Sequence, residues 1–158
     1  MPFASSACAT IQRRWRGAIL DIEHLMSVTK TAVPAKDPAI IGHYHAHIYY
    51  DPQTNRERAA LLRERVAATF PEVTLGRWHD ALVGPHPRSM YQMAFPHTLL
   101  ATFVPWLMLN REGLIILLHP ETGNNLVDHT DHAVWFGEVL PLRLDAFRGE
   151  QTAPPPGT

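Results

Sequence analysis

Three histidines alternate with other residues in the segment His43–His47, and the pattern runs on to Tyr50. Side chains at positions i, i+2 and i+4 of a β-strand point to the same face, so a strand here places three imidazoles in a row. Imidazole is the commonest protein metal ligand and titrates near neutral pH. A buried row of imidazoles without partners would be costly. The segment therefore predicts a metal site or an acid–base site.

A His-x-His pair on one strand face has Cβ atoms about 6.5–7 Å apart, which allows both rings to bind one metal. We expect His45 and His47 to form this pair and His119, from a neighbouring strand, to be the third ligand. His43 lies nearer the start of the strand and is a reserve ligand. Three nitrogen ligands leave open coordination positions, as catalytic sites need, and they suit Fe(II), Zn or Mn without choosing among the three. The alternative is that these histidines form local hydrogen bonds and bind no metal.

Three further residues are candidates for catalysis. We expect Arg77 and His79 to share one strand face, where Arg77 could hold a substrate carboxylate through two hydrogen bonds or simply form a surface ion pair. His86 lies between Pro85 and Pro87, which restrict the backbone and fix the direction of the ring. That restriction is typical of a positioned acid or base, and also of a structural turn.

The segment Asp128–His132 contains two more histidines between two aspartates. His129 or His132 could cap the site, and Asp128 or Asp131 could orient one of them as an outer partner. A solvated loop is the alternative, and for His129 it is the default interpretation. We keep His129 as a candidate catalytic residue.

Alternation and turn residues predict four strands and two helices. The expected order is strand, helix, strand, strand, helix, strand, over residues 41–50, 54–70, 73–79, 90–95, 98–110 and 114–119. This βαββαβ order is the ferredoxin-like pattern. The predicted fold class is therefore α+β, with a four-stranded antiparallel sheet and two helices on one face. A stretch over residues 139–144 could add a strand.

The predicted topology bears on where the histidines lie. We expect strands one and three to be central and parallel, with strands two and four running in the opposite direction. The starts of strands one and three would then share one end of the sheet with the ends of the other two. This arrangement predicts that His45, His79, His86 and His119 converge at that end.

The chain of 158 residues is long enough for one domain with a substantial core. Residues 1–36 have weak periodicity and are expected to be a poorly ordered extension. Residues 37–148 form the predicted domain. Residues 149–158, with three consecutive prolines, are expected to be a disordered tail.

Composition excludes several classes of function. A net charge of −1 gives no reason to expect binding to nucleic acid or to an anionic membrane. The single cysteine, Cys8, excludes a disulfide within the chain and a Cys-rich zinc site. No apolar run of membrane-spanning length and no secretory leader is evident, so we expect a cytoplasmic protein. A sheet with one uncovered face predicts a homodimer.

Seven segments together resemble the DOPA 4,5-dioxygenase family of small aromatic ring-opening enzymes. They occur in family order, within residues 41–142: His45–Asp51, Leu75–Asp80, Val83–Pro87, Met90–Phe95, Pro105–Arg111, His119–Gly123 and Asp128–His132. The resemblance implies extradiol cleavage of a catechol such as DOPA by non-haem Fe(II) and O₂, which gives a muconate semialdehyde-type product. It also implies that a histidine near the metal takes a catechol proton and later returns one. His79 and His86 are the expected residues for this role or for orienting the substrate.

The ligand set implied by the commoner extradiol enzymes is two histidines and one carboxylate. No carboxylate stands out in this chain, so the site either uses three histidines or takes an oxygen ligand from elsewhere. The candidates for that oxygen are Glu121, Asp80 and an aspartate of the segment Asp128–His132. The alternative function is a non-catalytic domain that binds a metal or a small ligand, because a fold alone does not imply a function.

Overall fold

The computed structural model describes residues 34–148. The predicted tail lies outside the described residues, as does the predicted extension except for its last three residues, so both stay predictions. No helix between residues 34 and 148 has the length and hydropathy needed to cross a bilayer. The elements in chain order are η1 (Pro38–Ile40), β1 (His43–Tyr50), α2 (Arg56–Thr69), β2 (Thr74–Leu75), β3 (Ser89–Pro96), η2 (His97–Leu99), α3 (Leu100–Asn110), β4 (Ile115–Pro120), α4 (Asn125–His129), β5 (Val134–Phe136) and η3 (Leu144–Phe147).

The fold is α+β, with one antiparallel sheet whose strand order is β2-β3-β1-β4-β5. This order is consistent with the ferredoxin-like pattern, but the sheet has five strands rather than four. The additional strand is β5, which pairs with β4, and residues 139–144 form no strand. The sequence therefore predicts the α+β class, but it places the additional strand too late in the chain.

The two central strands, β1 and β3, are antiparallel, so the expected parallel arrangement is wrong. The connection through α2 leaves β2 running in the same direction as β1, and β3 pairs with β2 in the opposite direction. The start of β1 therefore lies beside the ends of β3 and β4, with His43 opposite Pro96 and His45 opposite His119. The start of β3, which His86 precedes, lies at the other end of β1.

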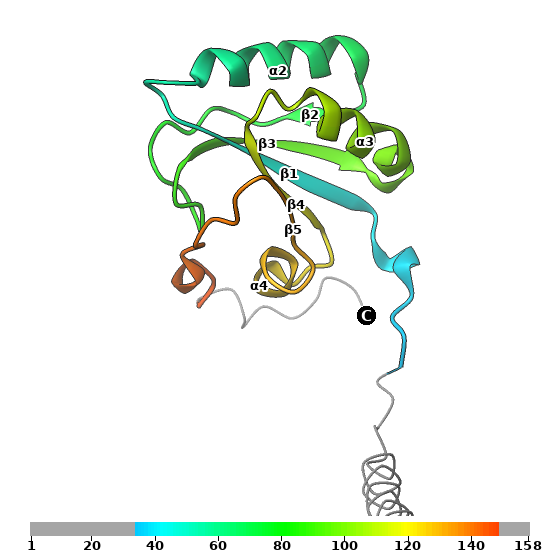
Figure 1. Ribbon diagram of the computed structural model, residues 1–158. Helices are drawn as coiled ribbons and strands as arrows, with labels where there is room; N and C mark the ends of the chain where they lie inside the picture. The colour runs from blue at the N-terminus through cyan, green and yellow to red at the C-terminus, as the bar shows by residue number, and fades with distance from the viewer. Residues whose placement is uncertain (1–33, 149–158) are drawn as a thin grey trace, which may run out of the picture. The chain divides into compact units, whose positions relative to one another are not determined.

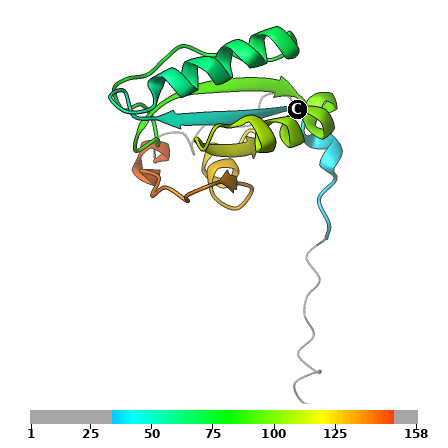
Figure 2. The same ribbon diagram turned by 45° about the horizontal axis from the view of Figure 1, so that its top comes forward.

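Alternation along β1 separates two faces of the sheet. Ala46 and Ile48 point to the face that α2 and α3 cover, and they belong to the main core together with Leu62 and Val66 of α2 and Phe103 of α3. Figures 1 and 2 show α2 on one side of the sheet. On the other side they show α4 and residues 137–148, which we call the C-terminal segment. The apolar spacing of four residues in α2 turns one side of that helix toward the sheet.

The opposite side of the sheet, which we call the histidine face, is partly covered by the chain itself. A second apolar cluster there joins Tyr49, Met90, Leu117 and Leu140, with Trp135 packed against it. The expectation of a homodimer was based on an uncovered face. Because α4 and the C-terminal segment cover part of that face, this reason for a dimer is weaker than the sequence suggested, and the dimer stays a prediction.

The second strand is much shorter than expected. Leu75 pairs with Met93, whereas His79 pairs with Met90, so four steps along one strand match three along the other. Such an extra residue reverses the side to which the following side chains point. Leu75 therefore packs under the helices, while His79 lies on the histidine face. The expectation of an unbroken strand over residues 73–79 is therefore wrong.

Candidate active site

Five imidazoles gather on the histidine face. His45 and His47 come from β1, His119 from the end of β4, His86 from the loop before β3, and His129 from α4. The ring centroids of His47 and His86 lie 4.2 Å apart, those of His119 and His129 4.0 Å apart, and those of His47 and His119 5.1 Å apart. Four separate segments of the chain thus bring their rings to one place.

The first possible ligand group contains the three residues that we predicted from the sequence, His45, His47 and His119. One nitrogen from each lies within 4.8 Å of the other two. The β1–β4 register explains this, because it sets His45 directly opposite His119. The Nε2 atoms of His47 and His119 are 3.0 Å apart. Two nitrogens that each lie about 2.1 Å from one metal at a right angle are also about 3.0 Å apart.

The second possible ligand group, His47, His86 and His129, meets the same 4.8 Å criterion. It shares His47 with the first group, and all three of its residues are buried. The two groups therefore describe overlapping positions in one cluster. Side-chain hydrogen bonds at the individual rings distinguish them.

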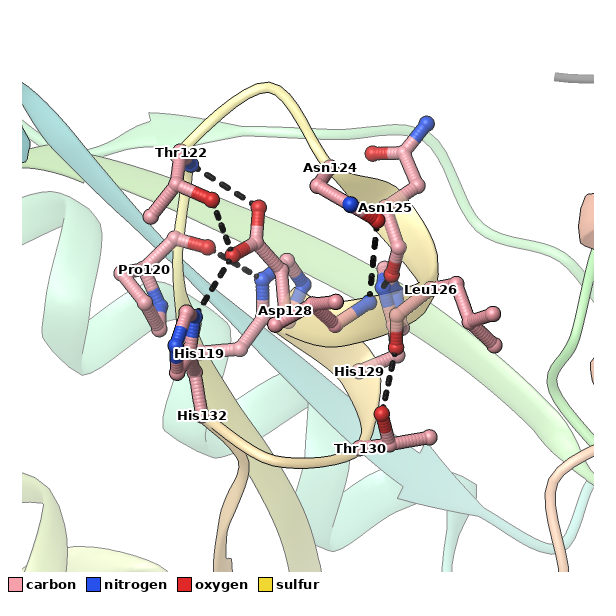
Figure 3. Close-up of polar contacts among 11 residues, drawn as sticks. His119, Pro120, Thr122, Asn124, Asn125, Leu126, Asp128, His129, Thr130 and His132 are labelled. Atoms are coloured by element: carbon pink, nitrogen blue, oxygen red, sulfur yellow. Dashed lines mark hydrogen bonds and ion pairs between the residues drawn. The ribbon is translucent and has the colours of Figure 1, made fainter. Parts of the chain in front are cut away.

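His119 and His129 are each held by a backbone carbonyl. His119 Nδ1 donates to the oxygen of Pro120 and His129 Nδ1 to that of Asn125, both at 2.8 Å (Figure 3). A carbonyl can only accept, so Nδ1 carries a proton in both rings, and when such a ring is neutral its lone pair is on Nε2. Metal-binding histidines are typically oriented in this way by a partner at the other ring nitrogen.

His47 contains the one buried side-chain nitrogen or oxygen without a hydrogen-bond partner among the described residues, its Nδ1. The side chain is 3 % exposed. A buried polar atom without a partner is costly and rare, and it often marks a place where an ion or water binds. The environment of His47 therefore fits a group that is not part of the protein chain.

Burial favours the neutral form of four of the five rings. Burial, with a smaller contribution from neighbouring histidines, lowers the pKa of His86 to about 3 and that of His119 to about 4. The pKa of His47 is well below its ordinary value for the same two reasons. Burial also lowers the pKa of His45, although the carboxylate of Glu121 opposes that shift. Neutral imidazole is the form that binds metal.

The loop that carries His86 is fixed from two sides. The amide of His86 donates to Val83 at 3.1 Å, closing a turn. The backbone amide of Arg143 donates to Pro85 and its guanidinium donates to Gly84, both at 2.8 Å. The C-terminal segment thus holds this loop against the sheet, which is how His86 reaches the cluster from the far end of β1.

The segment around His129 is a short helix, α4, and not a solvated loop. Asn124 caps it by accepting a hydrogen bond from Val127 at 3.2 Å. His129 is 8 % exposed, and its ring lies 5.0 Å from that of Phe147 in η3. The default interpretation of His129 as a solvent-exposed residue is therefore wrong, because distant parts of the chain bury it.

Asp128 organises the turn beside the cluster (Figure 3). Its carboxylate is 1 % exposed and accepts hydrogen bonds from the Thr122 amide at 2.8 Å, from the Thr122 hydroxyl at 2.6 Å and from His132 Nδ1 at 3.1 Å. Asp128 and His132 thus form one of the pairs that we expected. Their contacts stabilise the loop between β4 and α4, and α4 carries His129.

Of the other carboxylates within residues 34–148, Glu121 alone forms an ion pair with a residue of a ligand group. Neither group contains a carboxylate among the described residues. Asp80 accepts a hydrogen bond from Tyr50, whose side chain is on the helix side, and Asp131 is exposed. Glu121 lies nearest, with an oxygen 3.5 Å from His45 Nε2, and its side chain is 53 % exposed. Of the two alternatives, this geometry favours three histidines.

Arg77 and His79 are not brought into the cluster. Arg77 is exposed and makes no hydrogen bond or ion pair with another residue of the described range. His79 is half-buried on the histidine face, where its backbone pairs with Met90. Neither belongs to a possible ligand group. His45, His86 and His119 thus meet as predicted, but not at one end of the sheet through parallel strands, because β1 and β3 are antiparallel. His79 lies near His86 but belongs to neither ligand group.

Sequence reasoning passed over two residues of the histidine face. Tyr49 follows His47 by two positions, and its hydroxyl lies 2.7 Å from His86 Nδ1. Gln92 is opposite His47 in the β1–β3 register and is half-buried. The period of two would have placed Tyr49 beside the histidines, but the contact with His86 depends on a loop that periodicity does not describe.

Known proteins resemble this chain over the same region. The model of the Dopa 4,5-dioxygenase family matches residues 44–146. A DOPA 4,5-dioxygenase of Amanita muscaria is 35% identical over 111 residues, which are 66% of this chain and 49% of that protein. An uncharacterised 21.2 kDa protein of Botryotinia fuckeliana is 40% identical over 123 residues, 71% of this chain and 67% of that protein. The chain thus spans about half the length of the Amanita relative.

A solved crystal structure has the same fold. It is that of a candidate dioxygenase from Nostoc punctiforme, 48% identical in sequence, with a TM-score of 0.70. The match covers 73% of this chain and 98% of the Nostoc chain. At this level of identity the two chains are homologues, and the fold described above is shared with that protein.

Proposed function

The chain belongs to the Dopa 4,5-dioxygenase family, and on that premise we propose that it is a non-haem Fe(II)-dependent extradiol dioxygenase. Its substrates would be O₂ and a catechol such as DOPA, and its product a muconate semialdehyde-type compound. The observation that carries this proposal is the cluster of five histidines, four of them buried, on one face of the sheet. A cluster with this composition suits iron better than it suits magnesium or calcium, which prefer oxygen ligands.

His45, His47 and His119 would hold the iron. The 3.0 Å between the Nε2 atoms of His47 and His119 supports a metal at this position. His119 would be an oriented ligand, because Pro120 holds the proton on its Nδ1. Bound iron would supply the redox chemistry that allows a catechol and O₂ to react side by side.

During the reaction His129 would accept a proton and His86 would donate a hydrogen bond. His129 donates from Nδ1 to Asn125, so Nε2 carries the lone pair that could accept the second catechol proton. His86 lies against His47 and could donate a hydrogen bond to a substrate oxygen. His79, on the same face but outside both ligand groups, would orient the substrate. Burial under Phe147 and the C-terminal segment would keep water away from the reacting groups.

Oxygen consumption tests this function directly. Protein purified without oxygen, loaded with Fe(II) and mixed with catechol or DOPA in aerated buffer, is expected to consume one O₂ per ring opened and to form a yellow product. Metal-free protein is the control, and it should consume none. A loaded protein that binds iron but consumes no oxygen with any catechol of a panel would instead favour a non-catalytic metal-binding domain.

Arg77 is proposed to bind the substrate carboxylate, because it is exposed and makes no hydrogen bond or ion pair with the described residues. The change Arg77→Gln is expected to lower kcat/KM for DOPA by roughly 10- to 100-fold, the size of one lost charge-assisted hydrogen bond. Catechol itself has no carboxylate, so its kcat/KM should not change.

Steady-state kinetics of the two substrates provide the measurement. Arg58→Gln is the matched control, since Arg58 is an exposed arginine of α2, on the helix side of the sheet. It removes the same charge and should leave both substrates unaffected. Equal losses for DOPA and catechol in Arg77→Gln would show that Arg77 does not recognise the carboxylate.

A further inference from the structure

We propose that Tyr49 is a positioning residue that fixes the proton of His86 on Nε2, so that His86 donates a hydrogen bond and does not bind the metal. This inference rests on the proposed function and deepens it, because it assigns one role to each histidine of two overlapping ligand groups. It starts from a contact between two buried side chains that neither ligand group explains.

The Tyr49 hydroxyl lies 2.7 Å from His86 Nδ1, and the two residues are 2 % and 4 % exposed. The ring of Tyr49 stacks on that of Trp135, with centroids 5.9 Å apart and planes 16° apart. Within residues 34–148 the hydroxyl makes no other hydrogen bond. Stacking and burial prevent the ring from turning its hydroxyl toward solvent.

This geometry determines the direction of the hydrogen bond. If His86 Nδ1 carried the proton and donated to Tyr49, the phenol proton would point into the protein without an acceptor. A buried donor without an acceptor is unfavourable, whereas the reverse direction satisfies both groups. Tyr49 therefore donates to Nδ1, and the neutral ring of His86 carries its proton on Nε2.

His86 thus differs from the other two histidines that anchor the cluster. His119 and His129 donate from Nδ1 to carbonyls, so their Nε2 atoms carry lone pairs. Tyr49 keeps the proton of His86 on Nε2, so that nitrogen cannot bind a metal. The proton of His47 can instead move to its partnerless Nδ1 when Nε2 binds a metal. The group of His47, His86 and His129 therefore lacks one ligand, and the metal position is that of His45, His47 and His119.

The Nε2–H of His86 is then a hydrogen-bond donor beside His47, one of the proposed ligands. A fixed donor in a water-poor site stabilises negative charge that develops on a substrate oxygen. Without the Tyr49 hydroxyl the ring of His86 could take either tautomer, and part of the population would present a lone pair to the substrate. Tyr49 would thereby affect the rate of the reaction without touching the substrate.

Nitrogen-15 NMR of metal-free protein labelled in histidine reads the tautomer directly, with the His86 signals assigned from a His86→Gln variant. Wild-type protein is expected to show His86 protonated on Nε2 alone, and Tyr49→Phe a shift of both ring nitrogens toward a mixture of tautomers. Tyr91→Phe is the matched control. Tyr91 is also a fully buried tyrosine, and its hydroxyl donates to Ala59 on the helix side at 3.0 Å. It should leave the His86 signals unchanged.

A wild-type spectrum with the His86 proton on Nδ1 would overturn the inference even if Tyr49→Phe failed to fold. So would a folded Tyr49→Phe protein with unchanged His86 signals. Iron content provides a second arm: Tyr49→Phe and His86→Gln should keep the wild-type amount of iron per chain, and loss of iron from His86→Gln would make His86 a ligand.

The kinetic arm applies only if the protein turns over a catechol. Tyr49→Phe is then expected to lower kcat roughly tenfold, as for one lost hydrogen bond, with KM unchanged. An unchanged kcat would overturn the positioning role. If wild-type protein opened no catechol, the proposed function would fail, while the NMR and iron results would still decide which histidines bind metal.

Discussion

Replacement of His47 by alanine is expected to abolish metal binding and ring opening together. His47 is the single histidine shared by both possible ligand groups, so its loss leaves neither group with three ligands. Loss of an outer partner of a metal ligand already costs about 10- to 100-fold in affinity, so loss of a direct ligand should cost at least about 100-fold. The His47→Ala protein should consume no more oxygen than the metal-free wild-type protein.

Metal content per chain after dialysis, together with a titration of Fe(II) or Zn(II) into the metal-free protein, measures this effect. His97→Ala is the matched control, because His97 is an exposed histidine that contacts the carbonyl of Gly42 and belongs to neither ligand group. A thermal melt of the metal-free variants shows whether His47→Ala is folded. A folded His47→Ala protein with a full complement of metal would exclude the cluster as the metal site.

The local pattern around β1 was sufficient to find the centre of the candidate site. Alternation with a period of two places His45 and His47 on one face, and a neighbouring strand that ends in a histidine brings His119 beside them. These inferences succeeded because they depend only on strand geometry and on which strands are neighbours. They did not depend on the direction of β3, which the sequence interpretation had reversed.

Residues whose positions depend on irregular backbone could not be placed in this way. His79 lies on the opposite face of the sheet from Leu75, because one extra residue interrupts the regular pairing with β3 between them. His129 is buried because Phe147, 18 positions later, packs on its ring. Neither the extra residue nor this contact has a periodic signal in the sequence.

The contact between Tyr49 and His86 is a second example of a feature that sequence patterns predict only in part. Proline on both sides of His86 indicated correctly that its ring is held, but not which group holds it. Arg143 holds the loop against the C-terminal segment, and the Tyr49 hydroxyl contacts Nδ1 of the ring. Long-range hydrogen bonds of this kind become visible only when the chain is folded.

The metal-free protein is expected to lose several kcal/mol of stability as the pH falls from 6.5 to about 4.5. Burial lowers the pKa of His86 to about 3 and that of His119 to about 4, whereas both rings titrate near 6.5 in the unfolded chain. Between these values the unfolded state binds more protons than the folded state, so the free energy of unfolding rises with pH and falls on acidification. The stability that these neutral rings contribute is complete above pH 6.5.

The slope for each histidine is about 1.4 kcal/mol per pH unit, so two units of acidification cost the pair roughly 5 kcal/mol. That loss is comparable with the whole stability of a marginal domain. Urea unfolding of the metal-free protein at pH 7.0, 5.5 and 4.5 measures it as a fall in the midpoint at constant m.

Two variants separate this effect from the protonation of carboxylates, which also destabilises proteins in acid. His119→Gln removes one buried titrating ring and should make the slope shallower by about 1.4 kcal/mol per pH unit. His97→Gln changes an exposed histidine and should keep the wild-type slope. Metal should oppose the loss, because it binds the folded protein through deprotonated rings, and a loaded sample should stay folded to a lower pH. A free energy of unfolding that does not change between pH 7.0 and 4.5, or a slope identical in wild type and His119→Gln, would show that the cluster is not held neutral by burial.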